Sequence, residues 1–454
     1  MRLMACSGII GYGFAEESFR RGLEAGVAMI GCDAGSMDPG PFYLGTGTPF
    51  VSEEATRRDI ELMLTGAAEF GVPMIIGSAG GGGSNDQVAW TTDIVEDLAR
   101  KHGMAFKLAV INSEPDKGYL KDKLASGKIA PLGPIDDLTV NDIDQAARIV
   151  AMMGVEPLQA ALAAEANVII AGRCSDAAIY AALPIMLGYN PGQAWHLGKI
   201  VECGAQVIEP REGQDCIIGT LRDGYFEVEP GHPEKNCTKT RVAAHTLYEN
   251  PLPHELKEPS GVLDSSHCSF QQIDPRRVRV SGSSFRPTES YTVKLEGVRK
   301  VGYRSIFIAG VRDPILIERF DAFSEACRTR TREQVGSLGI SDSTYTVTFR
   351  TYGRGAVMGD REFVKIDDCP IELCVIGEVI ADNEAISRAV LAKARYSLLH
   401  TDFEGRLCIS GNLAFPFSPS DISVGEVYDF SVWHTLELDD PLEPFQISYR
   451  NISG

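Results

Sequence analysis

The sequence predicts an α/β protein with a large parallel-sheet (Rossmann-like) domain, helices on both of its faces, and a small C-terminal α+β domain. Short apolar runs alternate with helix-like patterns over the first two-thirds of the chain, and polar or glycine-rich loops follow several of these runs. Near residue 340 the pattern changes to half-exposed strands. We therefore expect domains at 1–340 and 341–454, with an irregular insertion around 205–300.

Five apolar runs are predicted to form strands of the parallel sheet, at residues 7–11, 27–32, 72–76, 106–111 and 168–172. Helix-like patterns separate them, such as the one that begins at Ser52 and ends at Gly71, residue types typical of helix starts and stops. Residues 143–153 and 157–166 are also predicted helices. Since βαβ crossovers are right-handed, helices should cover both faces and ligands should bind outside the carboxyl ends of the strands.

The remaining part of the chain is less regular. Turn-rich residues 205–300 suggest an antiparallel insertion, followed by a strand at 303–311 and a helix at 315–335. Beyond residue 340, strands are predicted at 344–349, 371–380 and 427–438, and a helix at 385–399.

The amino-acid composition argues against some classes of binding partner. The 454 residues carry a formal net charge of −19, which argues against nucleic acid or an anionic membrane as the main partner. No run approaches the roughly 18 apolar residues of a membrane span. The 11 cysteines are scattered without a C-x-x-C pair, which is typical of reduced, buried thiols. We expect a cytoplasmic homo-oligomer that binds a small anionic molecule.

A glycine-rich loop, residues 77–86 (GSAGGGGSND), joins an apolar run to a helix-like stretch. Backbone N–H groups here could form a nest for a phosphate or carboxylate. The candidate ligand-binding residues are Ser78, Gly80, Gly81, Gly82, Gly83 and Asn85. The loop lacks the Gly-Lys-Ser/Thr ending of a P-loop and gives only a weak dinucleotide fingerprint, so no NAD or FAD is expected. Alternatively, the loop serves close strand-to-helix packing, with Ser84 or Asn85 as the helix cap.

A second polar loop follows the predicted strand at 27–32. It contains Asp33, Ser36 and Asp38, with glycines and prolines that hold an irregular path. Carboxylates in such a position could act as general acid and base or hold a divalent cation. They could equally cap turns or helix ends.

Two further strand ends carry polar residues. Asn112 ends the run at 106–111, and Arg173, Ser175 and Asp176 follow the run at 168–172. Arg173 is the candidate for a bidentate grip on a carboxylate or phosphate. Alternatively, Arg173 forms an ion pair with Asp33 or Asp176, while Ser175 and Asp176 cap the next helix.

The segment 202–206 (ECGAQ) adds Glu202, Cys203 and Gln206. Glu202 could act as a general base, and Cys203 could be a nucleophile if the site lowered its pKa; a buried inert cysteine is the alternative. The eight histidines show no zinc-binding spacing. His196 alone lies near this segment, and a structural role is the simpler interpretation of it.

Taken together, residues 33–41 (DAGSMDPGP), the glycines at 80–83, residues 171–173 (AGR) and ECGAQ resemble the acyclic terpene utilisation AtuA family over about residues 5–340. The segment from Ser410 to Ile422 is similar to a small companion domain of such proteins. The resemblance implies catabolism of an organic acid or its CoA thioester. The stretch 11–16 (GYGFAE) departs from the Gly-Asp-Arg-like turn expected there, which implies a different substrate if this turn contacts the ligand.

Our functional hypothesis is an enzyme of organic-acid or acyl-CoA catabolism, a hydro-lyase or isomerase that abstracts a proton next to a carbonyl. The glycine loop and Arg173 would bind the anion, and the acid and base would come from Asp33, Asp38, Asp176 and Glu202, with a divalent cation as an open possibility. The absence of a G-x-S-x-G elbow argues against an ordinary α/β-hydrolase. The alternative is a non-catalytic subunit that binds an acyl-CoA or acid and scaffolds a complex.

Overall fold

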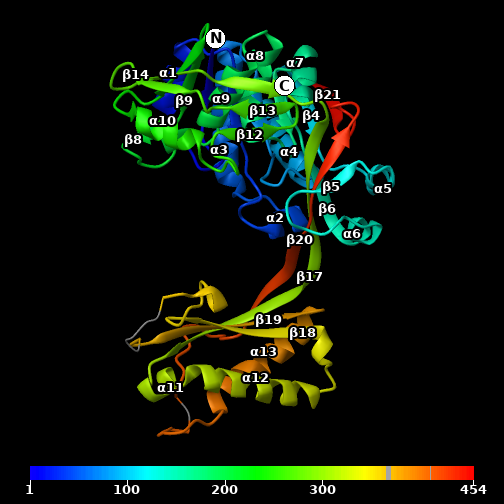
Figure 1. The fold of residues 1–454 in the computed structure, drawn as a ribbon, viewed down its shortest axis with the longest axis vertical. Helices are drawn as coiled ribbons and strands as arrows, with labels where there is room; N and C mark the ends of the chain where they lie inside the picture. Colours follow the sequence, from blue (N-terminus) through cyan, green and yellow to red (C-terminus); the bar gives the residue numbers. More distant parts are fainter. Residues whose placement is uncertain (365–369, 410, 454) are drawn as a thin grey trace. The chain divides into compact units, whose positions relative to one another are not determined.

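A computed structural model describes residues 1–364, 370–409 and 411–453 as a mixed α/β fold (Figure 1). Contacts group the chain into unit 1, Met1–Arg299 with Phe430–Gly454, and unit 2, Lys300–Asp429. The boundaries fall inside two long strands, β17 (Tyr291–Val311) and β20 (Ile422–Leu438). The domain division expected at residue 340 stays a prediction.

Unit 1 contains a ten-stranded mixed sheet with a parallel centre. The central strands run parallel to one another. Their order in the sheet is β1 (Arg2–Ala5), β2 (Ile30–Asp33), β3 (Met74–Gly77), β7 (Val168–Ala171) and β4 (Phe106–Asn112). The parallel strands are therefore confirmed, but they make up only part of the sheet. An antiparallel strand, β21 (Gln446–Ile452), extends it beyond β4.

The other side of the sheet is extended by antiparallel strands from the region 205–300, as expected. They are β9 (Ile217–Leu221), β10 (Tyr225–Pro230), β15 (Val278–Ser281) and β14 (Ser269–Gln272). The region also forms two smaller antiparallel sheets, from β8 (Ile208–Glu209) with β11 (Asn236–Cys237), and β12 (Glu255–Glu258) with β13 (Gly261–Asp264) and β16 (Ser284–Pro287).

Helices cover both faces of the parallel strands. Alternate strand residues divide between two apolar cores, so Ile75 belongs to one core and its neighbour Ile76 to the other. The first core is closed by α7 (Val155–Ala163), α8 (Asp176–Met186) and α9 (Pro191–Val201), and the second by α1 (Glu16–Glu24), α3 (Glu53–Phe70) and α4 (Asn85–His102). Further helices of this unit are α2 (Pro41–Thr46), α5 (Lys117–Ala125), α6 (Val140–Gln145) and α10 (Lys239–Thr246). No helix in the described part of the chain is long and apolar enough to cross a membrane.

Two elements differ from the sequence prediction. The first strand is Arg2–Ala5, and the predicted strand at 7–11 is wrong, because its glycines form a turn in which the N–H groups of Gly11 and Gly13 donate to the buried Asp59. The predicted helix at 143–153 is also wrong: β6 (Ala146–Met152) is a strand that pairs antiparallel with β17. The apolar run of β6 is compatible with a helix or a strand, and pairing with β17 makes it a strand.

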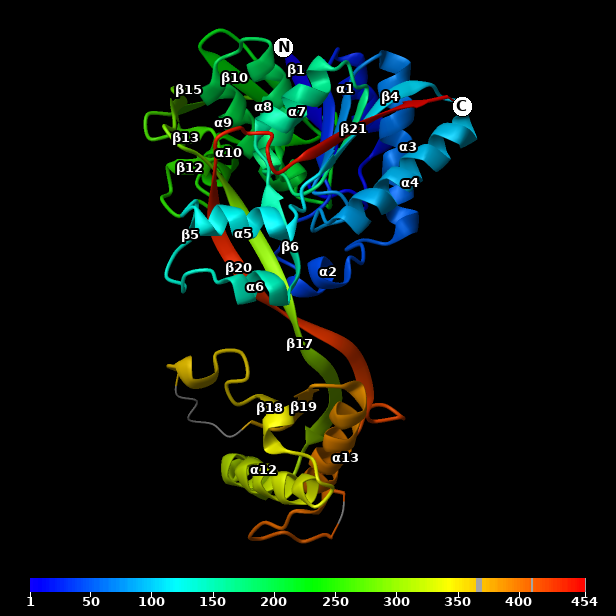
Figure 2. The same cartoon turned by 90° about the vertical axis from the view of Figure 1, so that its right-hand side faces the viewer.

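Unit 2 is an α+β unit. The strands β18 (Tyr345–Tyr352) and β19 (Leu373–Ala381) pair antiparallel, and β19 also pairs with the second half of β17. Helices α12 (Phe320–Gly336) and α13 (Glu384–His400) share the core of this sheet and lie on one side of it, and α11 (Pro314–Glu318) precedes them (Figure 2). Ser410, the first residue of the predicted companion segment, lies outside the described residues.

The glycine-rich loop between β3 and α4 is a close-packed junction. Gly83 adopts a φ of +72°, and a Cβ there would lie 2.1 Å from the backbone nitrogen of Arg173. The side-chain oxygen of Gln87 accepts hydrogen bonds from the N–H groups of Gly82 and Ser84, both at 3.1 Å. Ser84 caps α4 in a capping box. The packing role considered for this loop is therefore present.

This contact predicts a large effect of Gly83→Ala. The substitution should lower the free energy of unfolding by several kcal/mol, because neither of the backbone segments in contact can move aside. Gly103→Ala is the matched control, since Gly103 has a φ of +61° and nothing within 4 Å of its Cβ position, and it should cost only about 1 kcal/mol. Denaturant unfolding measures both; equal losses would contradict the packing argument.

Candidate functional site

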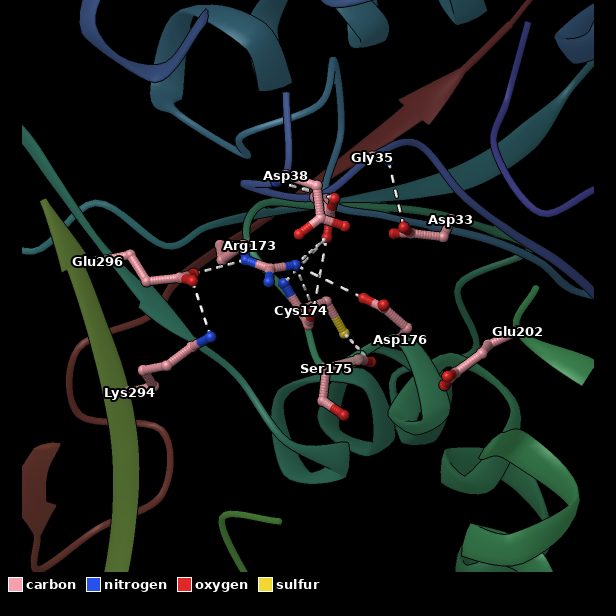
Figure 3. A network of polar contacts seen from close by, with 12 residues as sticks. Asp33, Gly35, Asp38, Arg173, Cys174, Ser175, Asp176, Glu202, Lys294 and Glu296 are labelled. Atoms are coloured by element: carbon pink, nitrogen blue, oxygen red, sulfur yellow. Dashed lines mark hydrogen bonds and ion pairs between the residues drawn. The ribbon is translucent and has the colours of Figure 1, made fainter. Parts of the chain in front are cut away.

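Polar residues converge at the carboxyl ends of the parallel strands (Figure 3). Asp33 is the last residue of β2, Ser78 follows β3, Ser113 follows β4 and Arg173 follows β7. These ends lie side by side because the strands are adjacent and parallel. The sequence placed a site at this edge, and the structure brings these side chains together there.

Arg173 is buried and held by several partners. Its Nε donates to Glu296 at 2.7 Å, and its Nη1 donates to Ser78 Oγ at 3.1 Å. Nη1 also lies 3.5 Å from a carboxylate oxygen of Asp176, so the ion pair considered as an alternative exists. Burial alone would lower the pKa of Arg173, but Glu296, Asp176 and Asp33 raise it above its usual value. The guanidinium is a fixed positive charge in the site.

Asp33 is a buried carboxyl with few stabilising partners. Its Oδ2 accepts a hydrogen bond from the N–H of Gly35 at 3.2 Å. Burial and the nearby Asp176 raise the pKa of Asp33 well above its usual value, and Arg173 and Ser78 offset this only in part. Burial therefore favours the protonated form of Asp33, which can donate a proton.

Ser175 and Asp176 stand at the start of α8. The Ser175 hydroxyl donates to Glu258 at 2.9 Å instead of capping the helix. Asp176 keeps 35% of its side chain exposed, and the rest of the side chain is buried. This burial raises the pKa of Asp176, against the opposing charges of Arg173 and Lys199. Burial also raises the pKa of Glu258 to about 8.

Glu202 lies at the C-terminal end of α9 and is buried. Lys199 Nζ donates to its Oε1 at 2.7 Å. Burial and the charge of Asp176 raise the pKa of Glu202 to about 8, although Lys199 opposes the shift. Burial and the charge of Glu202 also raise the pKa of Cys203, so its thiol is protonated. A nucleophilic cysteine needs the thiolate form, which this environment disfavours. Glu202, Cys203 and His245 place ligand atoms within 4.8 Å of one another and could hold a metal ion.

The remaining candidate residues from the sequence analysis have other environments. Asp38 is exposed, with its N–H donating to Ser36 Oγ at 3.2 Å. The Asn85 N–H donates to Glu114 at 3.0 Å, and Asn112 pairs with Gln446 of β21. The functional roles assigned to these residues, and to Gln206, stay predictions.

The glycine loop has few N–H groups left for an anion. The Ser78 and Ala79 N–H groups donate to carbonyls of the segment 171–172, that of Gly81 donates to Ser78, and those of Gly82 and Ser84 bond to Gln87. Anion binding by Gly80, Gly81, Gly82 and Gly83 stays a prediction.

His196 has a structural environment. Its two ring nitrogens contact Ser283 Oγ at 2.7 Å and Thr246 Oγ1 at 2.9 Å. Burial lowers the pKa of His196 to about 3, so it is a neutral core residue, as the simpler interpretation held.

Several titratable residues of the site were not predicted from the sequence. Glu296 and Lys294 come from β17, Glu258 from β12 and His245 from α10. All lie within residues 205–300, where the pairing of the strands is not visible in the sequence. Glu296 lies on the face of β17 opposite Val293 and Leu295, where the sequence alternation predicts exposure, yet it is fully buried. Its burial therefore leaves no signal in the local sequence.

The chain also matches a known family. The profile described as acyclic terpene utilisation family protein AtuA matches residues 53–368, well over half of the chain. The chain therefore belongs to the acyclic terpene utilisation AtuA family, as the sequence motifs indicated, and this family is implicated in a catabolic role. No curated protein and no solved structure matches the chain significantly.

Glu258→Gln should change how stability depends on pH. The pKa of Glu258 is raised on folding from about 4.5 to about 8, so the folded state binds the proton more tightly and wild-type stability falls as the pH rises through this window. Glutamine stays neutral and removes this loss. The variant should match wild type near pH 4.5 and exceed its free energy of unfolding by a few kcal/mol near pH 9, measured by denaturant unfolding. A constant difference across this range would contradict the assignment.

Glu296→Gln should destabilise the protein by about 3–5 kcal/mol, because it leaves the buried Arg173 without its main counter-charge. Glu96→Gln breaks a more exposed ion pair, with Arg450, and should cost no more than about 1 kcal/mol. Similar losses in the two variants, measured by denaturant unfolding, would show that Glu296 does not stabilise Arg173.

Proposed function

We propose that this protein is an enzyme of organic-acid or acyl-CoA catabolism, which performs acid/base chemistry next to a carbonyl as a hydro-lyase or isomerase. The observation that carries the proposal is the contrast between neighbouring carboxyl groups around Arg173. Burial favours the protonated form of Asp33, whereas Asp176 is partly exposed and faces the opposing charges of Arg173 and Lys199. Carboxyls whose environments separate their protonation states are typical of acid/base pairs.

The groups could divide the reaction between them. Asp176 or Glu202, as carboxylate, would remove a proton from the carbon next to the substrate carbonyl. Asp33 would donate its proton in one of two ways. In an isomerisation, the γ-carbon of the dienolate formed from a β,γ-unsaturated substrate would accept it, which shifts the double bond; in a dehydration, the hydroxyl departing from the β-carbon would accept it and leave as water. The raised pKa of each base strengthens its affinity for the substrate proton.

Arg173 supports binding of an anionic substrate. Its Nε and Nη1 contact protein groups, but no partner is found for Nη2 among the residues that the structure describes. This donor and the Ser78 hydroxyl would hold the carboxylate or the thioester carbonyl oxygen. The glycine loop would contribute shape more than hydrogen bonds. In this proposal the enzyme acts in the cytoplasm as a homo-oligomer.

A non-catalytic scaffold subunit is the second candidate. It is favoured by apolar side chains on unit 2 that are more than 80% exposed, namely Val357, Phe363, Leu407 and Ile409. Binding of an acyl-CoA without any proton exchange or turnover would support this candidate.

Exchange of substrate protons with deuterated water tests the enzymatic proposal without requiring the complete reaction. A panel of branched acids and their CoA thioesters would be incubated with the protein in D₂O, and deuterium next to the carbonyl measured by mass spectrometry. One panel member should exchange in the presence of wild type. Asp176→Asn, or Glu202→Gln if Glu202 is the base, should slow the exchange by about 10²–10⁴-fold.

Two further variants separate binding from chemistry. Arg173→Lys should weaken binding of the anion, because lysine loses the planar set of donors. Asp33→Asn should slow release of water or completion of the isomerisation more than it weakens binding. Asp223→Asn, on an exposed turn, is the control and should behave like wild type. If the Asp33 and Arg173 variants bind and turn over substrate like the control, the site is placed wrongly.

A further inference from the structure

A mixed cluster of possible metal ligands lies beside the carboxyl site in unit 1. A carboxylate oxygen of Glu202, the Cys203 thiol and a ring nitrogen of His245 all lie within 4.8 Å of one another. Glu202 and Cys203 follow α9, and His245 belongs to α10. Cysteine, histidine and glutamate together form a donor set typical of a zinc site.

An independent observation points to a ligand at His245. The imidazole is only 7% exposed, and its buried Nε2 has no hydrogen-bond partner among the described residues. Leaving such a nitrogen without a partner costs about 1–3 kcal/mol.

We propose that Glu202, Cys203 and His245 bind a divalent zinc-like ion that keeps an open coordination position. Three protein ligands plus a water or substrate position are typical of catalytic zinc sites. The ligand atoms of such a site lie about 3.5 Å apart, so the ligand atoms need to approach one another by about 1.3 Å at most.

The surroundings suit a divalent cation. Lys199 bonds to Oε1 of Glu202, which leaves the second carboxylate oxygen for the ion and orients the carboxylate. Glu249 lies 3.8 Å from Lys199. With Cys203 as a thiolate, the negative charges of Glu202, Cys203 and Glu249 balance Lys199 and a divalent ion.

A hollow beside His245 has room for a small ligand. His245 also lines a hollow of about 360 Å³ together with Gln206, Arg211, Arg241 and Tyr248. A small anion in this hollow could coordinate the ion, with arginines nearby. The proposal goes beyond the proposed function: if Glu202 holds a metal ion, Asp176 remains as the base.

Cobalt binding tests the site. Chelator-treated, reduced full-length protein titrated with Co²⁺ should bind one equivalent and develop the thiolate-to-cobalt charge-transfer absorption. Removing a residue that only hydrogen-bonds to a metal ligand weakens metal binding by about 10–100-fold. Cys203→Ser and His245→Gln each change a direct ligand, so each should weaken Co²⁺ binding at least that much. Cys268→Ser is the matched control, because Cys268 lies 3.6 Å from His196, outside the cluster, and should bind like wild type. Absence of stoichiometric binding, or unchanged affinity in Cys203→Ser, would overturn the proposal.

A measurement on the wild type covers the case in which a variant does not fold. Zn²⁺ should slow alkylation of Cys203 at least about ten-fold, measured by peptide mass spectrometry, and leave Cys268 unaffected. An unchanged rate at Cys203 would overturn the proposal. Both experiments measure metal binding without turnover, so their failure would leave the acid/base proposal intact, and failure of proton exchange would leave the metal site intact.

Discussion

The buried ion pair between Arg173 and Glu296 is the interaction on which the candidate site depends. It joins the end of a parallel strand to the long strand β17, with a separation of 2.7 Å between Nε and the carboxylate oxygen. Lys294 contacts the same carboxylate at 2.8 Å, so Glu296 is surrounded by positive charge and its pKa falls despite its burial. An ion pair this deeply buried stabilises the fold only when each charged group has partners for its hydrogen bonds.

That constraint orders the neighbouring groups. Because Glu296 holds one side of the guanidinium, the other side is directed toward Ser78 and Asp176. The backbone N–H of Arg173 donates to Ser113 Oγ at 2.6 Å, and Ser113 in turn donates to the carbonyl of Gly83. The close packing of the glycine loop and the position of the charge are therefore parts of one arrangement, in which Gly83 has no space for a side chain.

The sequence predicted this region well where the arrangement depends on local pattern. Asp33 and Arg173 each follow a short apolar run, and strands that run parallel must bring such positions to one edge. The sequence prediction failed for elements whose structure depends on pairing with a strand far away in the chain. The residues of β6 are compatible with a helix or a strand, and only β17, more than a hundred residues later, supplies the partner. Glu258 and Glu296 reach the site through antiparallel strands whose register is not visible in the sequence, so their burial could not be foreseen.

The return of the chain from unit 2 to unit 1 has a consequence for biosynthesis. Strand β4 is made early, but its antiparallel neighbour β21 consists of Gln446–Ile452. During translation, all of unit 2 leaves the ribosome before this edge of the large sheet can be covered. Until then β4 exposes unpaired backbone groups, which invite pairing with other chains. The nascent protein therefore has an interval of vulnerability whose length is set by the time needed to synthesise unit 2.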